Sequence, residues 1–181
     1  MDHLEAIIEL KKIIQPNFIK KIIPLINKKA KKKLAIGKRL NTNIRNVKGY
    51  TLNFNTPTNL FYFNYIKQEI ERLYVYYKIK FPKMASVKIS QIDLLKYNPG
   101  EKYEVHIDQY TRAPRHLSII INLNNNYEGG DLIFTDQKEK EIKRLKLDKG
   151  SIVFFPSNFM YPHSIQPITK GTRYSIVAWL Q

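Results

Sequence analysis

The stretch KYEVHIDQY, residues 102–110, carries residue types that often bind a metal ion. His106 is one of 4 histidines in the chain, and Asp108 follows it with one residue between them. Alternate residues of a β-strand share a face, so an imidazole and a carboxylate at this spacing would project together from one rigid element. The tripeptide alone is unspecific, because the same spacing occurs by chance on ordinary strands.

A metal site here needs at least one further ligand, and the remaining histidines are His3, His116 and His163. His163 follows a strand that reads as buried and a loop that contains proline. Two histidines and one carboxylate form the facial triad of non-haem iron oxygenases. Three such ligands with a bound water also suit a catalytic zinc ion, so ligand type alone leaves iron and zinc open.

Arg173 favours iron over zinc. It lies in TRYSIVAWL, where alternation places Arg173, Ser175, Val177 and Trp179 on one face of a predicted strand. An arginine that projects inward from an apolar strand is costly unless it meets an anion, and a guanidinium binds a carboxylate through two parallel hydrogen bonds. A dicarboxylic cosubstrate that reaches from an iron ion to Arg173 fits this pattern. A structural Arg–Asp pair inside the barrel is the alternative.

The elements that must position these residues lie mainly in residues 86–181. Six short β-type runs follow one another there, bounded by turn signals. They are SQIDLLKY, YEVHID, HLSIIINL, DLIF, SIVFF and TRYSIVAWL. Gly129-Gly130 is predicted to form a tight turn before DLIF. We predict an antiparallel barrel or sandwich for this part, within one α+β domain that spans residues 1–181.

Residues 1–85 are predicted to be mainly helical support for the barrel. A short amphipathic helix is expected before Pro16, and a second helix, capped by Asn17, with a kink or break at Pro24. Thr56-Pro57 combines a capping hydroxyl with a proline at the first helical position. This start is followed at helical spacing by Leu60, Phe63, Ile66, Ile70, Leu73 and Tyr77. We expect the resulting long helix to pack against the barrel.

Composition excludes several classes of protein. A chain of 181 residues with 43% hydrophobic residues can bury a core and is not disordered. It has no cysteine, so disulfides and thiolate metal sites are excluded. No apolar run reaches the roughly 18 residues of a membrane span. The N-terminal sequence MDHLEAIIELKKII does not resemble a signal peptide, and we expect an intracellular, cytoplasmic protein.

The net charge of +16 is concentrated in residues 11–67. No Asp or Glu occurs between Leu10 and Gln68, and all fourteen charged residues of that span are Lys or Arg. Such a span could bind nucleic acid or another polyanion. A solvated helical surface in a lysine-rich chain explains the same pattern and is the favoured interpretation.

Taken in order and spacing, four stretches make the chain from about Ser90 to Gln181 resemble the Fe(II)/2-oxoglutarate-dependent dioxygenases, in their prolyl-hydroxylase-like branch. The stretches are KYNPGEKYEVHID, RHLSIIINLN, YEGGDLIF and DKGSIVFFPSNFMYPHSIQPITKGTRYSIVAWLQ. The resemblance implies a double-stranded β-helix, a jelly-roll or cupin-like barrel with supporting N-terminal helices. Residues 1–85 resemble the family only loosely, through a helical entry and the stretch IRNV around Arg45.

The resemblance implies a role for individual residues. His106, Asp108 and His163 would bind Fe(II), and Arg173 would bind the distal carboxylate of 2-oxoglutarate. Tyr97 matches a tyrosine that hydrogen-bonds the cosubstrate. No catalytic side chain beyond the metal ligands is implied.

Tyr103 and Trp179 match pocket-lining positions of the family, and Ser175 is expected to line the pocket as well. The implied reaction consumes 2-oxoglutarate and O2, releases succinate and CO2, and hydroxylates an unactivated C–H. Its implied substrate is a prolyl or related residue of a peptide or protein, and ascorbate is a candidate additional cofactor.

Three other functions remain as alternatives. A nucleic-acid-directed oxygenase would use the basic span, but Trp179 stands where demethylases of the wider superfamily carry a second arginine. A non-catalytic binding module could retain the fold. A metal hydrolase could use the same three ligands but would leave Arg173 without a role. Arg112 and Arg115 are interpreted as solvated loop charges, in preference to residues that steer an acidic substrate.

Overall fold

The computed structural model describes residues 3–35, 41–85, 87–109, 111 and 114–181. In its first half the elements are η1 (His3–Ala6), β1 (Ile8–Leu10), α1 (Pro16–Lys29), β2 (Lys32–Lys33), β3 (Arg45–Asn46), β4 (Lys48–Thr51) and α2 (Pro57–Lys80). The second half is formed by β5 (Ile89–Tyr97), β6 (Lys102–His106), β7 (Leu117–Asn122), β8 (Tyr127–Gly129), β9 (Leu132–Thr135), β10 (Glu141–Leu145), β11 (Ile152–Pro156), β12 (His163–Ile165), β13 (Ile168–Gly171) and β14 (Arg173–Leu180).

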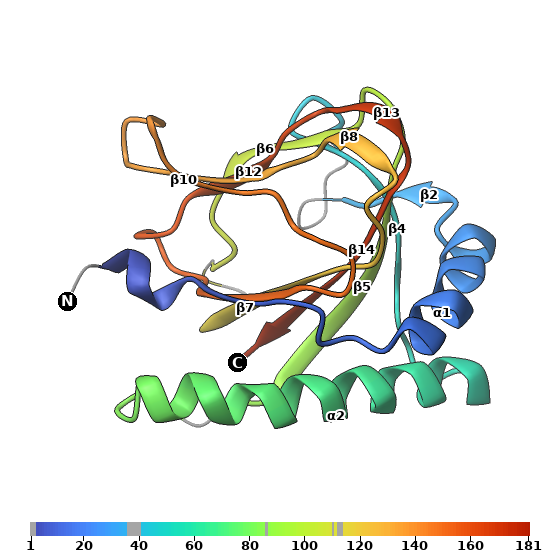
Figure 1. The fold of residues 1–181 in the computed structure, drawn as a ribbon, viewed down its shortest axis with the longest axis horizontal. Helices are drawn as coiled ribbons and strands as arrows, with labels where there is room; N and C mark the ends of the chain where they lie inside the picture. Colours follow the sequence, from blue (N-terminus) through green and yellow to red (C-terminus); the bar gives the residue numbers. More distant parts are fainter. Residues whose placement is uncertain (1–2, 36–40, 86, 110, 112–113) are drawn as a thin grey trace.

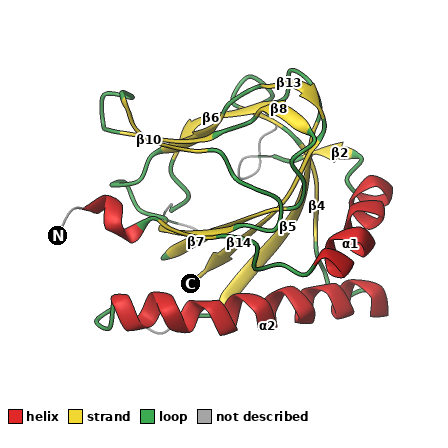
Figure 2. Cartoon of the chain, in the orientation of Figure 1, coloured by secondary structure: helices red, strands yellow, loops and turns green. Residues whose placement is uncertain are grey.

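Two antiparallel sheets face each other and enclose the interior of a barrel (Figure 1). The larger sheet has the strand order β1-β11-β7-β14-β5-β4-β2, and the smaller has the order β10-β9-β12-β6-β3. Strands β8 and β13 pair separately. Both helices lie outside the larger sheet, with α2 running along it (Figure 2). This arrangement is the predicted double-stranded β-helix with supporting helices.

Strand β14 shows how alternation builds two cores. Its residues Ile176 and Ala178 belong to the core between the larger sheet and the helices, which also holds Ile22 of α1 and Ile66 of α2. A second core lies between the two sheets and contains Leu95, Ile120, Val153, Leu132, Phe134 and Ile165. Because side chains alternate along a strand, the opposite face of β14 is directed into the barrel.

Helix α2 begins as predicted. The Thr56 hydroxyl accepts a hydrogen bond from the backbone N–H of Asn59 at 3.2 Å, and Pro57 occupies the first helical position. Leu60 was expected in the core but is 44% exposed. The buried positions of the helix are Asn59, Tyr62, Ile66, Ile70, Leu73 and Tyr77. Leu60 follows the buried Asn59 directly, and successive residues of a helix point in different directions, so Leu60 lies off the buried face.

The prediction of a helix before Pro16 is wrong. Residues Ile8–Leu10 form strand β1, which pairs with β11 in the register Ile8 to Phe154. Pairing satisfies backbone groups at the edge of the larger sheet, and this gain outweighs a short amphipathic pattern. Helix α1 begins at Pro16, so its N-cap residue is Gln15 and not Asn17 as predicted. The helix continues through Pro24 without a break.

Residues before position 86 also contribute strands to the barrel, which the sequence did not predict. Strand β4 pairs with β5 in the larger sheet, and β3 pairs with β6 in the smaller one. These strands are two to four residues long, too short for a period of alternation to be visible. Strands β8, β12 and β13, three to four residues long, were missed as well, and so was β10, which has five residues. Among the described residues, neither helix has the length and apolar content that crossing a membrane would need.

The tight turn predicted at Gly129-Gly130 is not assigned as one: Gly129 ends strand β8, and Gly130 lies in the short connection to β9. Both glycines have positive φ angles, +75° and +69°, which other residues rarely adopt. A Cβ at Gly130 would lie 3.1 Å from Cδ of Arg173 and would collide with Ile168. The glycine therefore gives Arg173 room at the end of the barrel.

Candidate metal centre and cosubstrate pocket

The two sheet-borne histidines of the predicted triad come from neighbouring strands. His106 is the last residue of β6 and His163 the first of β12, and the two are partners across this antiparallel pair. Asp108 lies past the end of β6, in a bend, and not on the strand as predicted. The chain turns after His106, so the bend brings the carboxylate to the histidines. One ligand atom from each of the three residues lies within 4.8 Å of the others.

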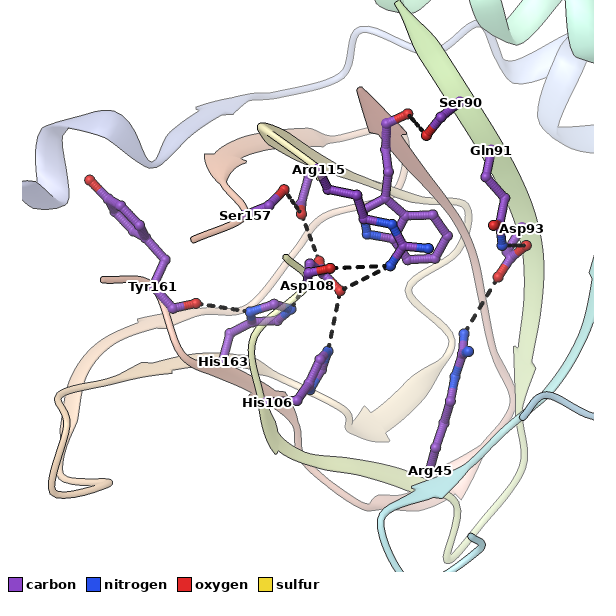
Figure 3. Close-up of polar contacts among 12 residues, drawn as sticks. Arg45, Ser90, Gln91, Asp93, His106, Asp108, Arg115, Ser157, Tyr161 and His163 are labelled. Carbon is purple, nitrogen blue, oxygen red and sulfur yellow. Dashed lines mark hydrogen bonds and ion pairs between the residues drawn. The ribbon is translucent and has the colours of Figure 1, made fainter. Parts of the chain in front are cut away.

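Hydrogen bonds to backbone carbonyls hold both imidazole rings, and Figure 3 shows the two rings beside the Asp108 carboxylate. Nδ1 of His106 is 2.8 Å from the carbonyl oxygen of Glu104, and Nδ1 of His163 is 3.1 Å from that of Tyr161. A carbonyl only accepts, so each Nδ1 carries a proton, and in the neutral ring Nε2 is then the nitrogen that can bind a metal. The two Nε2 atoms lie 3.6 Å from the carboxylate oxygens of Asp108. A metal ion between them would find three donor atoms.

The protonation states also fit a divalent cation. Burial alone would raise the pKa of Asp108, but the nearby His163 and His106 rings and a hydrogen bond from Ser118 hold it well below its usual range. Burial lowers the pKa of His163 to about 4. Asp108 is therefore ionised and His163 neutral near pH 7, the forms in which these residues bind metals.

Two serines hold the Asp108 carboxylate in place. The hydroxyl of Ser118 donates to Oδ2 of Asp108 at 2.6 Å, and its oxygen lies 2.7 Å from that of Ser157. Both serines are buried. Neither was identified from the sequence, because a serine on an apolar strand carries no signal of its partner.

A small cavity of about 20 Å³ lies beside the triad. Its polar lining comes from Arg45, Tyr97, Tyr103, Arg173 and Trp179, in addition to the three triad residues. Apolar side chains complete its wall: Leu95, Ile120, Ile165 and Val177. The structure therefore brings the predicted residues Tyr97, Tyr103, Arg173 and Trp179 to one cavity. The fifth predicted residue, Ser175, lies next to Arg173 and accepts a hydrogen bond from its Nη1 at 3.2 Å.

Arg173 is a buried cation with spare hydrogen-bond donors. Its side chain is 1% exposed, and its Nε and Nη2 have no partner. Within the described part of the chain it forms no ion pair, which argues against the structural Arg–Asp alternative. Nε and Nη2 form one edge of the guanidinium, and that edge matches the two oxygens of a carboxylate. Leaving such donors unsatisfied is costly, so the cavity suits an anionic ligand.

Burial raises the pKa values of Tyr97 and Tyr103, the latter to about 12. Both phenols therefore stay protonated near neutral pH and can donate hydrogen bonds. The ring of Tyr97 lies against the guanidinium of Arg173, with 5.4 Å between its centroid and Cζ. This contact keeps the arginine side chain against the wall of the cavity.

The interpretation of Arg115 as a solvated loop charge is wrong, and Arg112 lies outside the described residues. The Arg115 side chain is 12% exposed, and its Nη1 is 4.0 Å from Oδ1 of Asp108. Its Cζ lies 3.7 Å from the ring centroid of Trp179. The guanidinium of Arg115 thus lies between Asp108, a candidate metal ligand, and Trp179, which lines the cavity. The sequence alone does not indicate this position.

Arg45 is a second arginine that the sequence did not assign to the site. It reaches the cavity from β3 and forms an ion pair of 3.5 Å with the buried Asp93. One of the fourteen cations of the basic span is thus buried beside the triad and does not contribute to an exposed basic surface. The only sequence signal was the loosely matching stretch IRNV, and nothing in it indicates burial.

Comparison with known proteins places this site in a family. Residues 92–181 match the family model described as 2OG-Fe(II) oxygenase superfamily. A PKHD-type hydroxylase of Gloeothece citriformis is 31% identical over 100 residues, which cover 52% of this chain and 44% of the relative. Another from Idiomarina loihiensis is 26% identical over 102 residues, 54% of this chain and 45% of the relative. The chain thus matches less than half the length of these relatives.

Solved structures share the fold over nearly the whole chain. A prolyl hydroxylase from Trichoplax adhaerens, in complex with a peptide fragment of the hypoxia inducible factor oxygen degradation domain, has a TM-score of 0.79 at 16% identity, covering 99% of this chain and 86% of that one. A Pseudomonas putida prolyl-4-hydroxylase has a TM-score of 0.77 at 16% identity, covering 99% and 96%. The match over residues 92–181 shows that the chain belongs to the 2OG-Fe(II) oxygenase superfamily, and these solved structures show that it has the fold of prolyl hydroxylases.

Proposed function

We propose that this chain is an Fe(II)- and 2-oxoglutarate-dependent dioxygenase that hydroxylates an unactivated C–H, with succinate and CO2 as co-products. The observation that carries the proposal is Arg173. A fully buried guanidinium with an unsatisfied Nε–Nη2 edge lines the same cavity as a His-Asp-His cluster. A dicarboxylate that bridges a metal ion and this arginine satisfies both features with one ligand.

His106 and His163, through Nε2, and Asp108, through its carboxylate, would hold Fe(II). When bound, the iron and 2-oxoglutarate supply the activation of O2 and the oxidising power for the hydroxylation. The protein's part is positional. Ser118 fixes Asp108, and the backbone carbonyls of Glu104 and Tyr161 fix the two rings.

The cavity wall would orient the cosubstrate. Arg173 would bind its distal carboxylate through Nε and Nη2, and the protonated Tyr97 would donate a hydrogen bond to it. The apolar residues of the wall exclude water and so strengthen these charged contacts. Tyr103 and Trp179 would face the substrate end of the cavity, with Ser175 supporting Arg173.

For the substrate we propose a prolyl or related residue of a peptide or protein. This choice is supported by relatives that are named prolyl hydroxylases, one of them in complex with a peptide fragment. It is an inference from similarity and not from the cavity. Ascorbate is proposed as a reductant that keeps the iron in its Fe(II) form.

The purified chain, given Fe(II), 2-oxoglutarate, ascorbate and O2, is expected to form succinate, and to form more of it when a suitable proline-containing peptide is added. Succinate is measured by NMR, and hydroxylation as a mass gain of one oxygen on the peptide. Omitting Fe(II) or adding N-oxalylglycine is expected to stop both. Failure to form succinate under all of these conditions would refute the proposed activity, whereas turnover without peptide hydroxylation would refute only the substrate.

A further inference from the structure

His106 is held differently from the other two candidate metal ligands. The side chains of Asp108 and His163 are 6% and 4% exposed, whereas that of His106 is 14% exposed. Phe155 packs against the ring of His163, with 4.7 Å between centroids. The hydrogen bond from Nδ1 goes to a carbonyl two residues earlier in both histidines, so it does not distinguish them. Because His106 is the more exposed of the two, its ring orientation depends more on the side chain that packs against its face.

Tyr103 packs against that face. The rings of Tyr103 and His106 are stacked, with 3.6 Å between centroids and 13° between planes. The guanidinium of Arg45 in turn lies over Tyr103, with Cζ 5.1 Å from the ring centroid. Arg45 and Tyr103 are also partners in the pairing of β3 with β6. We call these three residues the Arg45 cluster.

Arg45 is itself fixed from two directions. Its Nη2 lies 3.5 Å from Oδ2 of Asp93, and its Nη1 donates to the carbonyl oxygen of Ala35 at 3.2 Å. Oδ1 of Asp93 accepts hydrogen bonds from Thr51 at 2.7 Å and from Gln91 at 2.8 Å. Figure 3 shows Arg45 extended toward Asp93 on β5 of the larger sheet. The Arg45 cluster thus links the larger sheet to a candidate metal ligand on the smaller one.

We propose that Arg45 is a positioning residue for the metal centre: held by Asp93, it presses the Tyr103 ring against His106 and so fixes the direction of His106 Nε2. A guanidinium over an aromatic face is attracted to it, and more strongly when water is excluded, as it is at this buried site. Asp93 balances the charge of Arg45, so the effect on the metal is exerted through ring orientation. The inference rests on the metal site of the proposed function and adds to it a residue from the first half of the chain.

Metal affinity tests the inference without any substrate. Co(II) is titrated into the metal-free protein, and both its affinity and its visible d–d spectrum are recorded. The variant Arg45→Met/Asp93→Asn removes the cation and its counter-ion together and so leaves no unpaired buried charge. We expect it to bind Co(II) about 10-fold more weakly, the effect of losing a residue that orients a ligand, with an altered spectrum.

Matched variants separate packing from polarity. Tyr103→Leu removes the stacked ring and is expected to weaken Co(II) binding as much as Arg45→Met/Asp93→Asn does. Tyr103→Phe keeps the ring and is expected to bind Co(II) as the wild type does. Arg45→Lys keeps a cation within reach of Asp93 and should recover most of the affinity. Combining Arg45→Met/Asp93→Asn with Tyr103→Leu should add little, because the residues act through one chain of contacts.

Co(II) binding by the wild type tests the metal site, and Co(II) binding by the variants tests the role of Arg45. A wild-type protein whose Co(II) binding does not depend on the triad contradicts the metal site itself. If the wild type binds, a folded Arg45→Met/Asp93→Asn protein with wild-type affinity and spectrum overturns the role of Arg45, even if its melting temperature has fallen. Should that variant not fold, Asp93→Asn alone serves instead, because it frees the guanidinium and is expected to weaken binding. Unchanged affinity in Asp93→Asn would equally overturn the inference.

Discussion

Replacing Asp108 with alanine is expected to abolish Fe(II)-dependent conversion of 2-oxoglutarate to succinate. Asp108 supplies the only negative charge among the three candidate ligands, so the variant would leave two neutral imidazoles to hold a divalent cation. Loss of a residue that merely supports a metal ligand costs roughly 10- to 100-fold in affinity or activity. Loss of the ligand itself should exceed that range, and succinate formation should fall to the level of a protein-free reaction.

The measurement is succinate released per protein in the presence of Fe(II), 2-oxoglutarate and O2, with circular dichroism to verify folding. Glu141→Gln is the matched control, because Glu141 is an exposed carboxylate on β10 that pairs with Arg144. It should retain wild-type turnover. A folded Asp108→Ala protein that still forms succinate at the wild-type rate would show that the cluster of His106, Asp108 and His163 is not the metal centre.

The second large effect is expected for Arg173→Met. The affinity for 2-oxoglutarate, measured by calorimetry with Mn(II) in place of iron, should fall at least about 30-fold. Truncating one partner of a buried, hydrogen-bonded charge pair costs about 2 kcal/mol or more, and about 1.4 kcal/mol corresponds to tenfold. Arg173→Lys keeps the charge but not the bidentate edge. Its affinity for 2-oxoglutarate should lie between those of Arg173→Met and the wild type.

Although Arg173→Met should weaken 2-oxoglutarate binding, it should not lower the thermal stability of the ligand-free protein. Without ligand, Arg173 is a buried cation with two unsatisfied donors, so an apolar side chain of similar length should leave the melting temperature unchanged or raise it. Adding Mn(II) and 2-oxoglutarate should raise the melting temperature of the wild type more than that of the variant. Tyr174→Phe is the control on the same strand, because Tyr174 faces the other way and its hydroxyl contacts Asn27. A marked loss of stability in ligand-free Arg173→Met would instead indicate a structural role.

Much of the barrel could be predicted because its strands obey local rules. The six predicted runs correspond to β5, β6, β7, β9, β11 and β14, and the alternation of TRYSIVAWL separates the two faces of β14. The start of α2 at Thr56-Pro57 was readable because a cap is a local interaction. Strand β1 was not, because residues 8–10 become a strand only by pairing with β11, far away in the sequence.

Some features of the candidate site could likewise be predicted from the sequence, and others could not. The candidate residues His106, Asp108, His163 and Arg173 could be proposed from the types and order of residues in the sequence. Their geometry could not, since it depends on the register that makes His106 and His163 cross-strand partners and on a bend at Asp108. Arg45 was missed because its burial results from pairing with a carboxylate on another strand.

The central claim is that one dicarboxylate bridges a metal ion on the triad and the guanidinium of Arg173. A crystal structure of the protein with Mn(II) and 2-oxoglutarate, recorded at the manganese absorption edge, tests it directly. We expect an anomalous peak within coordination distance of His106 Nε2, His163 Nε2 and an Asp108 carboxylate oxygen, and a distal carboxylate paired with Nε and Nη2 of Arg173. Manganese bound elsewhere, or 2-oxoglutarate bound away from Arg173, would contradict it.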